Sequence, residues 1–126
     1  MNLINTRVHG ILDYLVGFML IASPWIFGFG RGGAETWVPV AQGAAAVLYS
    51  LLTNYELGLV RLISMRIHLV LDLLGAVLLA FSPWIFGFSD LIWAPHLIMG
   101  VLEMIVVAMS VSVSGTEVKR GELSRS

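Results

Sequence analysis

The sequence predicts an all-α protein, a four-transmembrane-helix bundle built from two tandem two-helix repeats. The first observation behind this prediction is composition. Hydrophobic residues make up 58% of the 126 residues and charged residues 12%, and the mean hydropathy is +0.90. A soluble domain has about a quarter of its residues charged. The second observation is an internal repeat: segment 7–29 recurs at 66–88 without a gap, with 13 of 23 positions identical.

The two copies of the repeat read RVHGILDYLVGFMLIASPWIFGF and RIHLVLDLLGAVLLAFSPWIFGF. Apolar positions differ freely between them, whereas Arg, His, Asp and the block SPWIFGF recur in register. This pattern indicates a unit used twice, with repeat one at about 3–57 and repeat two at about 62–114. A polar cytoplasmic tail, 115–126, follows, and the whole chain 1–126 is predicted to be a single membrane domain. Because the first apolar run recurs in mid-chain, we interpret it as a permanent helix and not a signal peptide.

The transmembrane spans are predicted from four stretches without a charged residue, 14–30, 36–55, 73–89 and 104–116, which alternate with short polar segments. A bilayer core of about 30 Å needs roughly 20 helical residues. The four predicted spans are 5–22, 37–53, 64–81 and 93–114. Since each repeat holds two spans, the repeats share one orientation, and a pseudo-two-fold axis along the membrane normal is the expected arrangement.

The distribution of basic residues predicts the orientation of these spans. With four spans both termini lie on one side of the membrane, and that side carries six basic residues, whereas the other carries only Arg31. The positive-inside rule therefore places both termini in the cytoplasm. The six residues are Arg7, Arg61, Arg66, Lys119, Arg120 and Arg125.

The Ser-Pro-Trp block follows the first span of each repeat. The residue before a proline is disfavoured in the helical region, so we expect the spans to end near Ser23 and Ser82. Serine followed by proline also resembles an N-cap with proline at the first helical position, which predicts a short second helix or tight turn over 24–29. Trp25 and Trp84 are suited to the membrane interface. We interpret the block as structural.

Two copies of this block, Ser23-Pro24-Trp25 and Ser82-Pro83-Trp84, each at the end of the first of two apolar helices, resemble the SPW repeat family of small bacterial and archaeal membrane proteins. The resemblance covers residues 3–114. It implies a multi-pass protein of the prokaryotic inner (plasma) membrane. The family has no established biochemical activity, so the resemblance supports the architecture and adds little about function.

Polar residues inside the spans are the candidate functional residues. His9 and Asp13 are spaced i, i+4 and share a helix face, and His68 and Asp72 repeat this arrangement. A charged Asp facing lipid costs roughly 2.5–3.5 kcal/mol, so both acids are expected in the bundle interior. A polar network across the repeats is predicted, in which Arg7 or His9 pairs with Asp72, and Arg66 or His68 pairs with Asp13.

Glu103 and His96 are the further members of this predicted intramembrane polar network. Glu103 lies near the middle of the fourth span, and the aligned positions of the first repeat, Ala44 or Val47, are apolar. His96 lies seven residues earlier on the same face. A carboxyl group at the midplane is a candidate functional residue, or it bonds a backbone carbonyl or takes part in an oligomer contact.

Three classes of function are compatible with the sequence, and we expect the first. It is a non-enzymatic structural or scaffolding protein, or an accessory subunit, whose partners are the lipid bilayer and either further copies of itself or other membrane subunits. The second is proton or ion conduction through the intramembrane acids. The third is tetrapyrrole binding with His9 and His68 as paired axial ligands. No catalytic motif is present, so no enzyme is predicted.

Composition narrows the expected ligands. The chain has no cysteine, which excludes disulfides and thiolate metal sites. Its net charge of −1 gives no indication of a nucleic-acid partner. Neither a cofactor nor a metal is expected from the sequence.

Overall fold

The computed structural model describes residues 5–54 and 57–125, with side chains as far as residue 110. Within these residues it contains four helices, and its β-structure is limited to an isolated bridge between Thr53 and Ile63. The all-α prediction is therefore confirmed. Residues 55 and 56, between the second and third predicted spans, lie outside the described residues. The helices are α1 (Thr6–Ile26), α2 (Ala34–Leu51), α3 (Met65–Ile85) and α4 (Ala94–Arg125).

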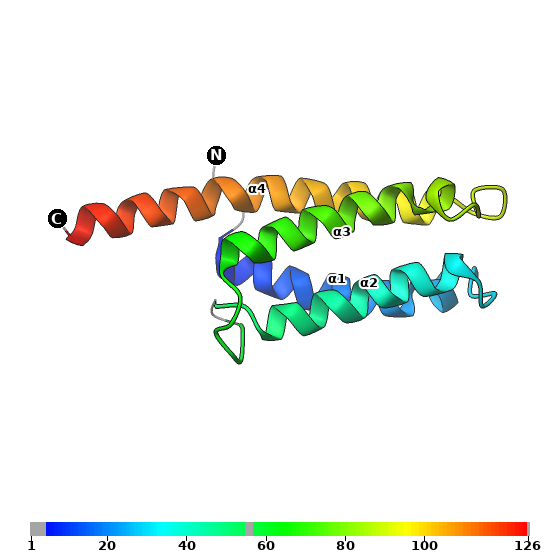
Figure 1. Cartoon of the computed structure of the whole chain (residues 1–126), viewed down its shortest axis with the longest axis horizontal. Coiled ribbons are helices and arrows are strands. Elements are labelled where there is room, and N and C mark those ends of the chain that lie inside the picture. The colour runs from blue at the N-terminus through cyan, green and yellow to red at the C-terminus, as the bar shows by residue number, and fades with distance from the viewer. Residues whose placement is uncertain (1–4, 55–56, 126) are drawn as a thin grey trace.

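The helices form two hairpins that lie side by side (Figure 1). Helix α1 packs along α2, and α3 packs along α4; the hairpins meet less extensively, through α2 against α3 and α1 against α4. Loops 27–33 and 86–93 lie at one end of the bundle, and the α2–α3 connection lies at the other (Figure 1). Helix α4 is longer than the predicted span 93–114, and its last turns project beyond the bundle.

Helices α1 and α3 begin and end in the same way. The side chain of Asn5 accepts a hydrogen bond from Val8 N at the start of α1, and that of Ser64 accepts one from Ile67 N at the start of α3. Each helix has 21 residues and is followed two residues later by a glycine with φ of 74°. The left-handed backbone at this point is one that glycine adopts without strain, so it ends each helix cleanly.

The predicted helix ends at Ser23 and Ser82 are wrong, because both prolines lie inside their helices. Pro24 has no N–H for the carbonyl of Leu20, four residues earlier. The hydroxyl of Ser23 donates to that carbonyl instead, at 2.8 Å. Ser82 likewise donates to the carbonyl of Leu79, at 2.7 Å, in front of Pro83. The serine is therefore a substitute donor that lets the helix continue through proline, and not an N-cap.

Helix α2 contains a proline that is accommodated by a different residue. Pro39 leaves the carbonyl of Glu35 without its usual helical donor. Nε2 of His96, from α4, lies 2.9 Å from this carbonyl oxygen, and because a carbonyl only accepts, the imidazole donates. The ring of His96 packs between Phe29 and Phe88, with centroids 4.9 Å from each. His96 therefore fastens the second hairpin to the first near the loop end of the bundle.

Small residues allow close contact within each hairpin. A Cβ added to Gly43 would collide with the backbone oxygen of Gly17 and lie 2.9 Å from Cγ1 of Ile21. A Cβ added to Gly100 would lie 2.6 Å from Cβ of Ala80. Both glycines thus let the second helix of a hairpin approach the first more closely than any larger residue would permit.

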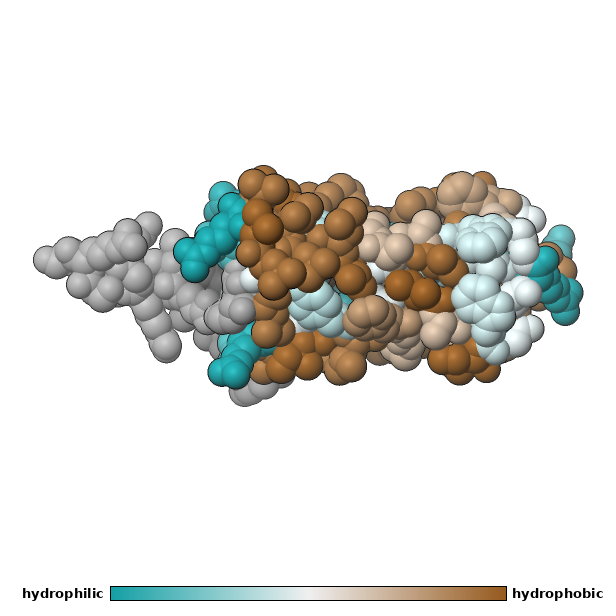
Figure 2. Space-filling model, turned by 90° about the horizontal axis from the view of Figure 1, so that it is seen from below, coloured by the Kyte–Doolittle hydropathy of each residue, from teal (hydrophilic) through white to brown (hydrophobic). Residues whose placement is uncertain are grey.

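The surface of the bundle is apolar and much of its interior is polar. Leu15, Phe18, Leu74 and Phe81 are more than half exposed, whereas the buried residues include three histidines, Asp72 and several hydroxyl side chains. On the face shown in Figure 2, hydrophobic residues cover the middle, and hydrophilic residues gather toward the ends. Among the described residues, α1 and α3 are long and apolar enough to cross a membrane, and α4 has a shorter apolar stretch over Ala94–Ser110.

Candidate functional site

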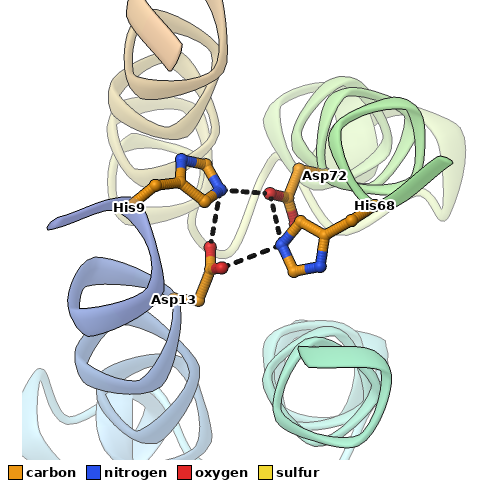
Figure 3. Close-up of side chains that lie close together, drawn as sticks. All are labelled: His9, Asp13, His68 and Asp72. Atoms are coloured by element: carbon orange, nitrogen blue, oxygen red, sulfur yellow. Dashed lines mark hydrogen bonds and ion pairs between the residues drawn. The ribbon is translucent and has the colours of Figure 1, made fainter. Parts of the chain in front are cut away.

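Two histidines and two aspartates meet where α1 faces α3, near the end of the bundle at which both helices begin (Figure 3). Nε2 of His9 lies 3.0 Å from Oδ1 of Asp13 and 2.9 Å from Oδ2 of Asp72. Nε2 of His68 lies 2.8 Å from Oδ2 of Asp13 and 3.1 Å from Oδ2 of Asp72. Each imidazole therefore contacts one carboxylate on its own helix and one on the other. We call these four residues the His–Asp cluster.

The cluster follows from the i, i+4 spacing on each helix. One turn of helix separates His9 from Asp13 and His68 from Asp72, so each pair projects from one face. That face is turned inward in both helices, because the side chains of the four residues are at most 8% exposed. The predicted pairing across the repeats is present for His9 with Asp72 and for His68 with Asp13.

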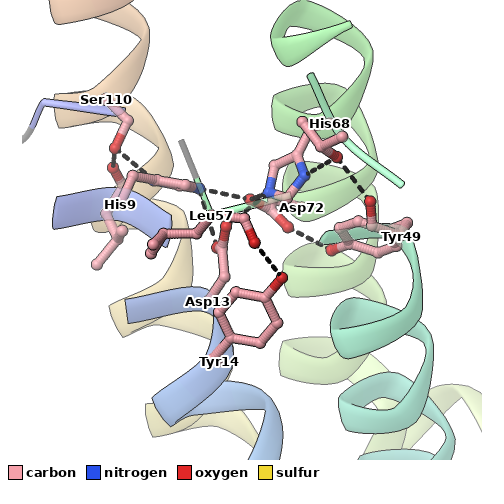
Figure 4. Close-up of polar contacts among 10 residues, drawn as sticks. His9, Asp13, Tyr14, Tyr49, Leu57, His68, Asp72 and Ser110 are labelled. Atoms are coloured by element: carbon pink, nitrogen blue, oxygen red, sulfur yellow. Dashed lines mark hydrogen bonds and ion pairs between the residues drawn. The ribbon is translucent and has the colours of Figure 1, made fainter. Parts of the chain in front are cut away.

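A hydroxyl group supports the outer nitrogen of each imidazole (Figure 4). Nδ1 of His9 lies 2.7 Å from Oγ of Ser110, and Nδ1 of His68 lies 2.7 Å from Oγ1 of Thr53. Ser110 donates its proton to the carbonyl of Val106, and Thr53 donates to the carbonyl of Tyr49. Since each hydroxyl has one proton, it accepts from the imidazole, and Nδ1 of both rings carries hydrogen. Both Nε2 atoms consequently face the carboxylates.

Tyr49 supports Asp72 from helix α2. Its hydroxyl donates to Oδ1 of Asp72, which leaves Oδ2 to contact both histidines. Tyr49 also packs edge-on against the ring of His68, with centroids 5.0 Å apart. If α2 is aligned with α4 so that Thr53 matches Ser110, the position of Tyr49 falls on Val106, which has no hydroxyl. The inner contacts of the cluster are thus nearly symmetric, and Tyr49 adds a support to Asp72 that the alignment of α2 with α4 does not repeat.

Glu103 lies beside the cluster and not within it. A cavity of about 90 Å³ opens where α1 faces α4, and its lining includes His9, Asp13, Asp72 and Glu103 among mostly apolar side chains. Oε2 of Glu103 is buried without a hydrogen-bond partner among the described residues. Helix α4 therefore presents a carboxyl group to the same cavity as the two aspartates.

The structure separates the residues that the sequence placed in one polar network. Arg7 and Arg66 are exposed, and in the described part of the chain neither makes an ion pair. The histidines are the partners of the aspartates, because His9 and His68 are buried whereas the arginines two residues before them are exposed. His96 lies near the other end of the bundle, with its hydrogen bond to Glu35. Only Glu103 shares a cavity with the cluster.

Sequence reasoning missed the three supporting hydroxyl side chains, Thr53, Ser110 and Tyr49. The signal for the first two was an alignment of the second helices. At an offset of 57 residues Gly43 matches Gly100 and Thr53 matches Ser110. Tyr49 has no counterpart in such an alignment, so only the packing of α2 against α3 reveals it.

The fold and the site define an all-α protein of two packed helical hairpins, with membrane-length apolar helices and a buried His–Asp cluster at their junction. The SPW repeat domain matches residues 7–110, so the chain belongs to the SPW repeat family. No curated protein and no solved structure matches the chain.

Proposed function

We propose that this chain is a non-enzymatic integral membrane protein, structural or accessory in role, in which the His–Asp cluster is a clasp between the two hairpins. The observation that carries the proposal is the pair of N···O contacts that link α1 to α3, His9 to Asp72 at 2.9 Å and His68 to Asp13 at 2.8 Å. Contacts between the hairpins are otherwise sparser than those within them. A buried clasp at this junction sets how one hairpin lies against the other.

Membrane placement is supported by the distribution of polarity. Large apolar side chains such as Leu15, Phe18 and Leu74 are exposed, whereas histidine and aspartate side chains are buried. In water this arrangement would be unfavourable, because exposed apolar area costs about 25 cal/mol per Å². In a bilayer this arrangement is favourable, because the apolar side chains contact lipid and the polar side chains are kept away from it. We place the chain in the prokaryotic inner membrane as four spans, with the clasp end and both termini in the cytoplasm.

The basic residues support this orientation. Arg7, Arg61 and Arg66 are exposed at the clasp end of the bundle, whereas Arg31 lies in a loop at the other end. Excess basic residues mark the cytoplasmic side. Assembly with further copies or with other membrane subunits remains our expectation for a chain of this size.

Ion conduction receives less support from the geometry. The clasp and His96 lie toward opposite ends of the bundle, and the fully buried side chains between them include Leu20, Ala76 and Leu79, which are apolar. Proton relay requires closely spaced polar groups or water along the whole path. Flux of protons across liposomes that contain the protein, compared with empty liposomes, tests this alternative.

Paired axial ligation of a tetrapyrrole also receives less support. Both Nε2 atoms would have to face the metal of a flat macrocycle lying between the rings. In this structure the carboxylates of Asp13 and Asp72 occupy that place, within 3.1 Å of Nε2 of His9 and His68. The visible spectrum of the natively purified protein tests the alternative, since a bound tetrapyrrole absorbs strongly.

The clasp is tested by its contribution to stability. Breaking a buried ion pair by removing one partner typically costs about 3–5 kcal/mol. We expect Asp72→Asn to lower the free energy of unfolding in detergent by an amount in or just below this range. Asp90→Asn, in the loop 86–93, is the matched control, because this exposed carboxylate is not part of the cluster. Equal stability of the two variants would contradict the clasp.

A further inference from the structure

We propose that His9, Asp13, His68 and Asp72 bind one divalent transition-metal ion of the Zn²⁺ class at the junction of the two hairpins. The proposal rests on the clasp geometry of the proposed function and adds a ligand to it. The four side chains each offer one ligand atom, and these atoms all lie within 4.8 Å of one another (Figure 3).

The size of the cluster fits a four-coordinate ion. Zn²⁺ binds imidazole nitrogen and carboxylate oxygen at about 2.0–2.2 Å, so neighbouring ligand atoms of a tetrahedral site are separated by roughly 3.3 Å. The four N···O contacts in the cluster measure 2.8–3.1 Å. With an ion bound, these contacts would lengthen by a few tenths of an ångström, and the longest separation between ligand atoms, at most 4.8 Å, would shorten.

The chemistry of the donor set selects the class of metal. Imidazole suits Zn²⁺ and neighbouring transition metals, whereas Mg²⁺ and Ca²⁺ take six or more oxygen ligands. Two carboxylates carry two negative charges, so a doubly charged ion leaves the bound cluster neutral overall. Neutrality matters at this position, since the cluster side chains are almost fully buried and an uncompensated charge there is costly.

The orientation of the imidazoles is already that of metal ligands. Nδ1 of each ring donates to a hydroxyl, Ser110 for His9 and Thr53 for His68, so Nε2 of each ring is directed to the cluster (Figure 4). Metal-bound histidines almost always donate their other N–H in this manner. Tyr49 holds Oδ1 of Asp72 and leaves Oδ2 for the metal. The supporting contacts thus resemble those around metal sites.

The cavity provides an approach to the ion. It adjoins His9, Asp13 and Asp72, and Glu103 lines it from α4 with a buried carboxylate oxygen that has no hydrogen-bond partner among the described residues. The carboxyl group of Glu103 thus faces the same cavity as three of the proposed ligands, and it is not one of the four ligands.

Metal binding is measured on the full-length protein in detergent after removal of metals with a chelator. Co²⁺ is the probe, because its visible absorption reports four-coordinate nitrogen and oxygen ligation. We expect one Co²⁺ per chain, displaced by Zn²⁺ and not by Mg²⁺. Inorganic Co²⁺ in the same detergent gives the reference spectrum.

Variants assign the binding to the cluster. His68→Gln and Asp13→Asn should abolish the four-coordinate spectrum. Thr53→Val keeps all four ligands and removes one support, so it should retain binding with an affinity about 10–100-fold weaker. Asp90→Asn is the control, because this exposed carboxylate lies in the loop 86–93 outside the cluster, and it should bind as the wild type does.

Two results would overturn the metal site. One is a wild-type spectrum identical to that of free Co²⁺, which would mean that ring protons alone occupy the cluster. The other is equal loss of binding in Asp90→Asn and His68→Gln. The stability comparison of Asp72→Asn, made in the presence of chelator, tests the clasp independently of the metal, so the failure of one is distinguishable from the failure of the other.

Discussion

Nε2 of His9 lies 2.9 Å from Oδ2 of Asp72, although 63 positions separate the two residues in the chain. This contact and its counterpart between His68 and Asp13 link the first helix of one hairpin to the first helix of the other. Each helix contributes one base and one acid. Neither hairpin alone can therefore complete the cluster.

The orientation in the membrane is the first prediction. A reporter fused after residue 126 should read cytoplasmic, because exposed Arg7, Arg61 and Arg66 lie at the end of the bundle where α1 and α3 begin. A reporter inserted in loop 27–33 should read exterior. The measurement is reporter activity or protease access in intact cells, and reversed readings would refute the proposed topology.

The Ser–Pro pairs predict that removal of the proline compensates for loss of the serine hydroxyl. Ser82→Ala leaves the buried carbonyl of Leu79 without a donor and should destabilise by about 1–3 kcal/mol. Pro83→Ala restores the backbone N–H, so the double variant should be more stable than Ser82→Ala alone. Thermal unfolding in detergent measures the three variants. If Pro83→Ala does not rescue Ser82→Ala, the hydroxyl is not the substitute donor.

His96 gives a parallel prediction across the hairpins. Replacement of His96 by Phe removes the donor to the carbonyl of Glu35, and we expect a loss of stability of about 1–3 kcal/mol. Pro39→Ala supplies a helical N–H to that carbonyl and should recover part of the loss. A double variant no more stable than the single one would show that His96 acts only through its packing with Phe29 and Phe88.

Gly43 tests the close approach of α1 and α2. Gly43→Val places side-chain atoms against Gly17 and Ile21 and should destabilise by at least about 1–3 kcal/mol. Ala44→Val is the control, because Ala44 is the next residue of the same helix and is exposed. The comparison is made by thermal unfolding in detergent. Equal stability of the two variants would mean that the hairpin does not need the contact.

Much of the fold could be predicted because its determinants are local. The apolar stretches between charges gave all four helices, and the i, i+4 pairing of His9 with Asp13 and of His68 with Asp72 indicated which faces turn inward. The helix ends were misjudged at the prolines. The residue before a proline disfavours helix, but this preference was outweighed by a hydrogen bond. The hydroxyl of Ser23 donates to the carbonyl of Leu20, nearly one turn earlier in the helix.

The partners of the aspartates could be predicted only in part. From the sequence, arginine and histidine were equal candidates for the partner of each aspartate. Burial distinguishes them in the structure, because Arg7 is exposed at the start of α1 whereas His9 is buried. The proposed metal site was not expected from the sequence, since it depends on the distance between α1 and α3. Tyr49 and the cavity beside Glu103 likewise arise from packing between helices and leave no periodic signal.

A double-mutant cycle on His9 and Asp72 tests the clasp most directly. The free energy of unfolding is measured in detergent with chelator for the wild type, His9→Gln, Asp72→Asn and the double variant, and the same cycle with Arg7→Gln is the control. We predict a coupling of about 0.5–3 kcal/mol for His9 with Asp72, as for residues in contact, and additivity for Arg7 with Asp72. Additive losses for His9 and Asp72 would contradict the account.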